Sequence, residues 1–142
     1  MLMKVVIAGK GGYGVKFLGT LLGKILMRDN QVVVTFDYDA ASRGGDIIAY
    51  VVYDKEKIGN PTIDVADLLL KFSDIDGLKG KEVIEFNFDC KSYRVNMVAL
   101  GYLLKRIGVE VSSDELKDLI KKDSEKNVEG ILYGMTDIDT IS

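Results

Sequence analysis

Two hydrophobic patterns alternate along the first two thirds of the chain. Short runs of apolar and β-branched residues, bounded by glycine or charged residues, are typical of strands. They occur at 5–8, 31–36, 46–53, 67–72 and 82–88. Between the first two runs, residues 15–28 repeat with the period of a helix, and the apolar stripe consists of Val15, Leu18, Leu22, Ile25 and Leu26. The chain is therefore predicted to begin with a strand, a helix and a second strand.

The last third of the chain is predicted to be helical. From 92 to 107 apolar residues point in several directions, which is typical of a helix at the centre of a domain or at an interface. Gly108 follows at the position of a C-terminal cap. The run Ser112-Ser113-Asp114-Glu115 resembles a capping box, and the apolar pattern of the helix after it continues beyond a break near Ser124.

These elements predict an α/β fold, because strands and helices are interleaved. We expect one Rossmann-like, three-layer domain over 1–142, with a largely parallel sheet and a helical C-terminal third. The strands at 5–8 and 31–36 are expected to be parallel neighbours joined by the first helix. On that helix Gly19 and Gly23 share a face, and because glycine costs a helix about 1 kcal/mol relative to alanine, they indicate a close contact there.

Composition narrows the range of functions. The 142 residues carry a net charge of −3, and no long basic block occurs, which disfavours nucleic acid as a partner. The first residues run directly into a strand without the basic region of a signal peptide. No apolar run reaches the roughly 18 residues that a spanning helix needs. We therefore expect a cytoplasmic protein with no membrane partner.

The sequence has no histidine, and Cys90 is its only cysteine. One thiolate is too few to hold an iron–sulfur cluster, a zinc site of the His/Cys type cannot be formed, and triads with a histidine base are excluded. Cys90 is expected to be a packed or partly exposed thiol and not a nucleophile. We predict no catalytic residue and no metal ligand in this chain, and no cofactor that it binds by itself.

The glycine-rich stretch 9–14, Gly-Lys-Gly-Gly-Tyr-Gly, lies between the first strand and the first helix. A strand, a glycine loop and a helix in this order can turn backbone N–H groups and a helix N-terminus toward an anion. The same glycines can instead serve only to let a tight turn pack. The loop alone leaves both interpretations open.

One candidate ligand for this loop is a dinucleotide. Gly9, Gly11 and Gly14 satisfy the pattern G-x-G-x-x-G, and Asp37 ends the next strand where a ribose-binding acid belongs. Against this, the chain lacks a second mononucleotide-binding half. A free-standing nucleotide-binding module of the Rossmann type, for NAD or a related molecule, is therefore the alternative hypothesis.

Four motifs in order resemble a known family more specifically. They are residues 9–15, then Asp37-Tyr38 with Ser42-Arg43-Gly44-Gly45, then 58–61 with Ala66-Asp67, and finally 96–101, Asn-Met-Val-Ala-Leu-Gly. Together they resemble the gamma subunits of the 2-oxoacid:ferredoxin oxidoreductases, which act on pyruvate, 2-oxoglutarate, ketoisovalerate or indolepyruvate. Asn127 and Gly134 fit the tail of that family. The family usually has Gln at the position of Tyr13, and the stretch between Asp67 and Asn96 is short for a member.

This resemblance implies a role in a complex that decarboxylates a 2-oxoacid oxidatively to an acyl-coenzyme A. Thiamine diphosphate and iron–sulfur (Fe-S) clusters are then held by partner subunits, and electrons pass to ferredoxin. The implied partners are the alpha and beta subunits, with a delta subunit where the complex has one. The gamma chain is implied to contribute structure and to lie near the coenzyme A region, without catalysing the reaction alone.

If the first two strands are neighbours, the loops that follow them lie on one rim of the sheet. That rim would bind a ligand or partner through Gly9, Lys10, Gly11, Gly12, Tyr13, Gly14, Ser42, Arg43, Gly44 and Gly45. Arg43 suits a phosphate or carboxylate, although an ion pair with Asp37 or Asp39 is an equal alternative. Lys10 could neutralise an anion beside the loop, but a solvated side chain is the favoured interpretation. Asp37, Tyr38 and Asn96 are expected to be structural or interface residues.

Overall fold

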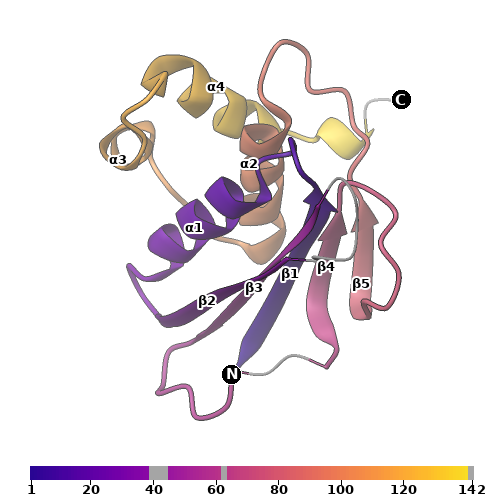
Figure 1. The fold of residues 1–142 in the computed structure, drawn as a ribbon. Helices are drawn as coiled ribbons and strands as arrows, with labels where there is room; N and C mark the ends of the chain where they lie inside the picture. Colours follow the sequence, from indigo (N-terminus) through magenta and orange to yellow (C-terminus); the bar gives the residue numbers. More distant parts are fainter. Residues whose placement is uncertain (39–44, 62–63, 141–142) are drawn as a thin grey trace. The chain divides into compact units, whose positions relative to one another are not determined.

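The computed structural model of the protein describes residues 1–38, 45–61 and 64–140. Two compact units divide the chain, Met1–Phe86 and Asn87–Ser142, and each is described here by itself. The first unit contains the sheet and the second contains helices (Figure 1). None of the helices in the described ranges is long and apolar enough to cross a membrane.

The first unit is built on five strands in the order β2-β3-β1-β4-β5. Their bounds are β1 Met3–Lys10, β2 Gln31–Tyr38, β3 Asp46–Asp54, β4 Ala66–Lys71 and β5 Gly80–Glu85. The sheet is mixed, since β1 pairs in parallel with β4, and β4 with β5, while β3 runs antiparallel to both β1 and β2. The α/β class and the helical C-terminal third are confirmed.

The expected adjacency of the first two strands is wrong. β1 and β2 are parallel to each other, but β3 lies between them and is paired with both over eight residues or more. After β2 the chain turns back, and β3 pairs antiparallel with β2 on one side and with β1 on the other. The apolar pattern of a strand does not show which strand lies beside it. Parallel β1 and β2 nevertheless end at the same edge of the sheet.

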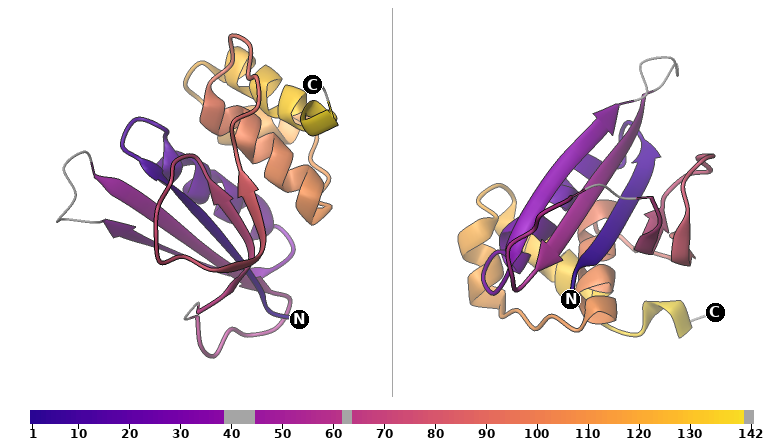
Figure 2. Two further views of the ribbon diagram at one scale, coloured as in Figure 1. Left: turned by 90° about the vertical axis from the view of Figure 1, so that its right-hand side faces the viewer. Right: turned by 90° about the horizontal axis from the view of Figure 1, so that it is seen from below.

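Helix α1, Val15–Leu26, packs on one face of this sheet (Figure 2). The close contact indicated by its two glycines is confirmed. A Cβ atom at Gly19 would lie 2.9 Å from the Cβ of Ala49 on β3, and one at Gly23 would lie 2.6 Å from Val34 Cγ2 on β2. Glycine at these two positions therefore lets the helix backbone approach the strands.

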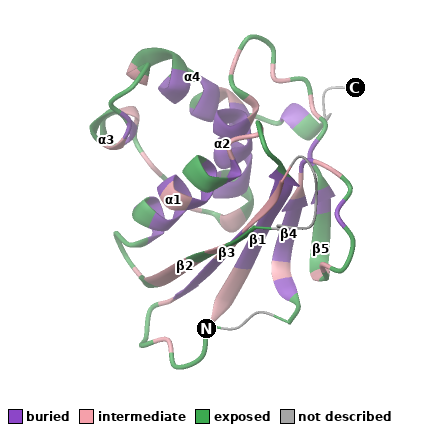
Figure 3. Cartoon of the chain, viewed as in Figure 1, coloured by how far each residue is buried: buried purple, intermediate pink, exposed green. Residues whose placement is uncertain are grey.

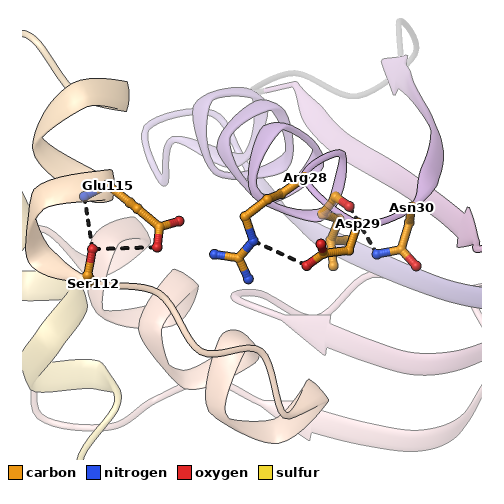
Figure 4. A network of polar contacts seen from close by, with 6 residues as sticks. Arg28, Asp29, Asn30, Ser112 and Glu115 are labelled. Carbon is orange, nitrogen blue, oxygen red and sulfur yellow. Dashed lines mark hydrogen bonds and ion pairs between the residues drawn. The ribbon is translucent and has the colours of Figure 1, made fainter.

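The turn after α1 is held by local polar contacts. The Asn30 side chain donates to the carbonyl oxygen of Leu26 at 3.0 Å, and Arg28 Nε donates to Asp29 Oδ2 at 3.2 Å (Figure 4). Asn30 therefore caps a carbonyl that the helix itself leaves without an intrahelical partner. The chain enters β2 directly afterwards.

The second unit consists of helices α2 Val95–Ile107, α3 Ser113–Leu119, α4 Ser124–Gly134 and the short 3-10 helix η1 Ile138–Thr140. Both caps expected from the sequence are confirmed. Gly108 has φ 86° and ends α2, and Ser112 Oγ accepts from the Glu115 N–H at 3.2 Å at the start of α3 (Figure 4). The Ser112 hydroxyl also donates to Glu115 Oε1 at 3.5 Å.

Helices α2 and α4 cross in backbone contact. A Cβ atom at Gly101 would lie 1.9 Å from the carbonyl oxygen of Ile131, and one at Gly134 would lie 2.0 Å from that of Val98. Beside the crossing, the buried Asn127 side chain donates to the Lys122 carbonyl oxygen at 2.9 Å. Gly101, Asn127 and Gly134 thus have structural roles in joining these helices.

The C-terminal segment is attached to α2 by polar contacts. The Tyr102 hydroxyl donates to Asp139 Oδ2 at 3.2 Å, and Lys105 forms an ion pair with Asp137. Burial, followed by the negative charge and the hydrogen bond of Asp139, raises the pKa of Tyr102 to about 12. Between these contacts Ile138 is buried.

Candidate functional site

The candidate site is the edge of the sheet where β1 and β2 end and β3 begins. We call this edge the rim, and its described part comprises 9–14, Asp37, Tyr38 and Gly45. The Gly11 N–H donates to the Gly45 carbonyl oxygen at 2.9 Å. This bond joins the loop after β1 to the residue just before β3, so the two glycine segments meet although β1 and β2 are not neighbours.

The loop 9–14 is shaped by glycines of two kinds. Gly12 and Gly14 have φ of 101° and 73°, a region that favours glycine, and Gly14 is the N-cap residue of α1. Gly9 has a different role, because a Cβ atom there would lie 3.1 Å from the Cβ of Phe72. At Gly12 no atom of the described residues would lie within 4 Å of an added Cβ, so this part of the loop has open space around it in the described part of the chain.

The loop rests on an aromatic side chain from the residue that follows β4. The Tyr13 ring stacks on Phe72 with centroids 5.2 Å apart and planes inclined by 9°, and Phe72 in turn meets Phe86 edge to face. The Lys10 N–H donates to Ser73 Oγ at 3.1 Å, while the Lys10 side chain is exposed. Tyr13 therefore serves as an aromatic support for the loop, a role that an amide at this position would not fill.

Charged groups gather where β3 begins. Asp46 lies opposite Lys10 in the β1–β3 register, and its Oδ1 atom is buried without a hydrogen-bond partner among the described residues. Asp37 is exposed at the end of β2. Burial, with a smaller contribution from the charge of Asp37, raises the pKa of Tyr50. The rim thus presents one exposed lysine beside the start of α1, with the buried Asp46 Oδ1 beneath it lacking a partner among the described residues. The N–H groups of Lys10, Gly11 and Tyr13 are already bonded within the rim.

The structure places some predicted site residues together and leaves others undescribed. The rim contains Gly9, Lys10, Gly11, Gly12, Tyr13, Gly14, Asp37, Tyr38 and Gly45. Ser42, Arg43 and Gly44 lie outside the described residues, as does Asp39. Asn96 belongs to the second unit, near the start of α2, where it is buried. The ligand- or partner-binding role of these residues remains a prediction.

Sequence reasoning missed Phe72, Ser73 and Asp46 as residues of this site. Phe72 and Ser73 follow β4, which pairs in parallel with β1, so both strands end at the same edge. The sequence places them at the end of the strand predicted at 67–72, and they could have been assigned to the site if that strand had been known to pair in parallel with β1. Asp46 could have been found only by knowing that β3 runs antiparallel to β1.

Two other features bear on possible chemistry in the second unit. An open hollow of about 560 Å³ surrounds the start of α4 and is lined by Ser92, Tyr93, Asp123, Ser124, Glu125, Lys126 and Glu129. The Cys90 thiol donates to the Phe88 carbonyl oxygen at 3.4 Å, and burial, then the charge of Asp89, raises its pKa. A raised pKa keeps the thiol protonated, which does not suit a nucleophile.

Among the described residues no group of three acidic, histidine or cysteine side chains is placed to hold a metal ion.

Comparison with known families settles the family. The sequence model of the pyruvate ferredoxin/flavodoxin oxidoreductase family matches residues 4–85, more than half of the chain. The chain belongs to this family. The resemblance inferred from the four motifs is confirmed. A search of curated protein sequences gives no significant match.

Solved structures share the fold of this family member. The gamma subunit of keto/oxoacid ferredoxin oxidoreductase from Geobacter sulfurreducens PCA is 18% identical, with 94% of each chain covered and a TM-score of 0.66. Pyruvate oxidoreductase subunit PORC from Thermotoga maritima is 20% identical, with 94% of each chain covered and a TM-score of 0.64. A 2-oxoglutarate:ferredoxin oxidoreductase from Magnetococcus marinus, solved with 2-oxoglutarate, coenzyme A and succinyl-CoA bound, is 19% identical with a TM-score of 0.71. There 99% of this chain matches only 32% of the longer chain.

Proposed function

We propose that this chain is the gamma subunit of a 2-oxoacid:ferredoxin oxidoreductase that works in the cytoplasm. The observation that carries the proposal is the family match over residues 4–85, and the fold shared with two gamma-type chains over 94% of their lengths supports it. In the complex, alpha and beta subunits, with a delta subunit where one exists, hold thiamine diphosphate and the Fe-S clusters. They oxidise the 2-oxoacid to an acyl-coenzyme A and pass electrons to ferredoxin.

The strand order argues against the alternative of a dinucleotide-binding module. In that type of site the second strand lies next to the first, so that its terminal acid reaches the ribose of a dinucleotide bound at the first loop. Here β3 separates β1 from β2, and Asp37 is therefore displaced by two strand spacings, about 10 Å, from β1. Asp37 does not occupy the expected ribose-binding position.

The rim is the part of the chain that we assign to contact with coenzyme A or with a partner subunit. Its support is geometric. Gly12 and Gly14 of loop 9–14 have positive φ, no described atom would lie within 4 Å of a Cβ at Gly12, and the Lys10 side chain is exposed beside it. A phosphate group or an acidic partner loop suits the exposed lysine and the N-terminus of α1, which begins directly after Gly14. The chain contributes a shaped surface, while its partners supply the reacting groups.

Purification of the tagged full chain from its native source tests the assembly. We expect larger subunits to co-elute with it, together with thiamine diphosphate, iron and acid-labile sulfide, and the sample should reduce ferredoxin with a 2-oxoacid and coenzyme A. Deletion of the chain should abolish that activity. A chain that elutes alone, and whose deletion leaves the activity intact, contradicts the proposal. Calorimetric detection of tight NAD binding that is lost on Asp37→Ala would favour the dinucleotide alternative instead.

A further inference from the structure

The connection between β4 and β5 contains the only place in the sequence where an aspartate or an asparagine is followed directly by glycine, Asp76-Gly77. Both residues are exposed and lie in a turn, and Figure 3 draws much of this connection in green. The aspartate side chain and the backbone nitrogen of the next residue are close along the chain, so the two groups can react with each other.

Both reacting groups are free of hydrogen bonds to the residues that the structure describes. The Asp76 carboxylate forms no hydrogen bond or ion pair with them, and the Gly77 N–H has no acceptor among them. Gly77 has φ 87°, and no described atom would lie within 4 Å of a Cβ atom there. Because glycine has no side chain, Gly77 itself does not shield its nitrogen. The turn therefore leaves the carboxyl group and the nitrogen able to approach each other.

Two other exposed aspartates show the contrast. Asp123 accepts a hydrogen bond from Arg94 Nη2 at 3.2 Å, and the residue after it begins α4. Asp89 Oδ1 accepts the N–H of Lys91 at 2.9 Å. The residue that follows each of them also carries a side chain, which crowds the nitrogen that would react. The conditions for the reaction thus meet at Asp76 and are absent at these two positions.

We propose that Asp76 is a modification site, where the backbone link to Gly77 isomerises spontaneously to an isoaspartyl link. The Gly77 nitrogen attacks Cγ of Asp76 and loses its proton, while a carboxyl oxygen leaves as water, and a succinimide ring closes. Water then adds to the backbone carbonyl carbon of Asp76, and the bond from this carbon to the Gly77 nitrogen breaks. Gly77 stays attached through Cγ. The two steps release and consume one water, and nothing is oxidised or reduced.

The product has a chemical feature that an enzyme can recognise. The former backbone carbonyl of Asp76 becomes a free carboxylate, and the side-chain methylene becomes part of the main chain. Methyltransferases that repair isoaspartate transfer a methyl group from S-adenosylmethionine to this carboxylate. The modified turn is therefore a substrate for that class of enzyme.

The modification lengthens the main chain between two anchored residues. On one side of the turn Ile75 is buried, and on the other side Leu78 packs against a buried cluster that contains Val6 and Leu69. β5 begins shortly after Leu78. A closely packed interior accommodates extra length only by moving side chains or strands. We therefore expect the modified protein to be less stable than the fresh protein.

Ageing of the full, isolated chain tests the proposal. The folded protein is kept at neutral pH and physiological temperature, and the same chain unfolded in urea is kept beside it. Isoaspartate is measured with purified isoaspartyl methyltransferase and labelled S-adenosylmethionine, and it is located by a protease that cuts before aspartate but not before isoaspartate. We expect isoaspartate to accumulate in both samples, and in the folded sample to lie almost entirely at Asp76.

Asp76→Glu is the matched variant, because it keeps the charge while its longer side chain closes a ring less readily. After ageing it should lose nearly all methyl acceptance. Asp123→Glu is the control and should leave methyl acceptance unchanged. Denaturation with urea should give a lower free energy of unfolding for the aged protein than for the fresh one, and no such difference for Asp76→Glu. Circular dichroism spectra checked before ageing show that both variants fold.

Three results would overturn the proposal. A folded chain that stays free of isoaspartate, while the unfolded chain accumulates it at Asp76, would show that the turn protects the site. Isoaspartate found mainly at other residues, or persisting in Asp76→Glu, would place the reaction elsewhere. Equal stability of aged and fresh protein would contradict the expected effect on packing. None of these outcomes depends on assembly or on the proposed enzymatic role, so the two proposals fail separately.

Discussion

The glycines of the rim and the glycines of the helix crossing serve opposite purposes. At Gly12 the backbone has φ 101° and an added Cβ would meet no atom of the described residues within 4 Å, so conformation accounts for glycine there. At Gly101 a Cβ would lie 1.9 Å from a backbone oxygen of α4, and proximity alone accounts for it. Glycine therefore allows an unusual backbone conformation at the surface of one unit and a close backbone contact between helices in the other.

The largest effect is expected from Gly101→Ala. Although alanine favours a helix by about 1 kcal/mol, the new Cβ meets the Ile131 carbonyl oxygen, which cannot rotate away, and we expect a loss of about 3 kcal/mol or more in unfolding free energy. Denaturation with urea measures this. Gly130→Ala is the control on the facing helix, because its Cβ would lie 3.2 Å from the Cβ of Tyr93 and should cost about 1 kcal/mol at most. Equal stability of both variants would show that the crossing is looser than described.

A smaller loss is expected at the contact between α1 and the sheet. Gly23→Ala places a Cβ 2.6 Å from Val34 Cγ2. Because the Val34 side chain has some freedom to shift, we expect the unfolding free energy to fall by about 1–3 kcal/mol. The double variant with Val34→Ala should recover part of it, because the two positions share one space. Strictly additive losses in this cycle would contradict a direct contact.

Gly12→Ala separates conformation from function at the rim. We expect a cost of about 1–2 kcal/mol in unfolding free energy from its positive φ alone. Gly77→Ala is a matched control, since Gly77 has φ 87° and equally open surroundings but lies between β4 and β5. If the rim binds coenzyme A or a partner subunit, only Gly12→Ala should weaken assembly or raise the KM for coenzyme A, by at least about tenfold. Similar activity of the two variants would remove the rim from the functional site.

The smallest expected effect is a loss of stability at high pH that comes from Tyr102 on α2. Its neighbour Tyr102 has a pKa raised to about 12, so the folded protein holds that proton more tightly than the unfolded chain, whose tyrosine pKa is near 10. This contribution to stability is complete below pH 10 and is lost as the pH rises toward 12. Thermal unfolding between pH 9 and 12 should show the decline, and Tyr102→Phe should reduce it. Burial also raises the pKa values of Tyr50 and Tyr53, so a smaller decline should remain.

Much of the local structure could be predicted from the sequence, because it depends on neighbours along the chain. The apolar runs marked all five strands, the glycine loop was placed between a strand and α1, and the caps at Gly108 and Ser112 form as expected. The close contact at Gly19 and Gly23 was predicted for the same reason, since residues four apart share a helix face. Four short motifs in order were sufficient to indicate the family.

Only the tertiary structure decided which strands are neighbours. The pattern of β1 is the same whether β2 or β3 lies beside it, and the insertion of β3 between them moved Asp37 away from the glycine loop. For the same reason Phe72 under Tyr13, and Ile131 against Gly101, could not be found, because each pair is joined by contacts between distant segments. The single-domain organisation of 1–142 and the binding role of the rim remain predictions. Side-chain periodicity reports which face of an element is buried, and it carries no information on which other element covers that face.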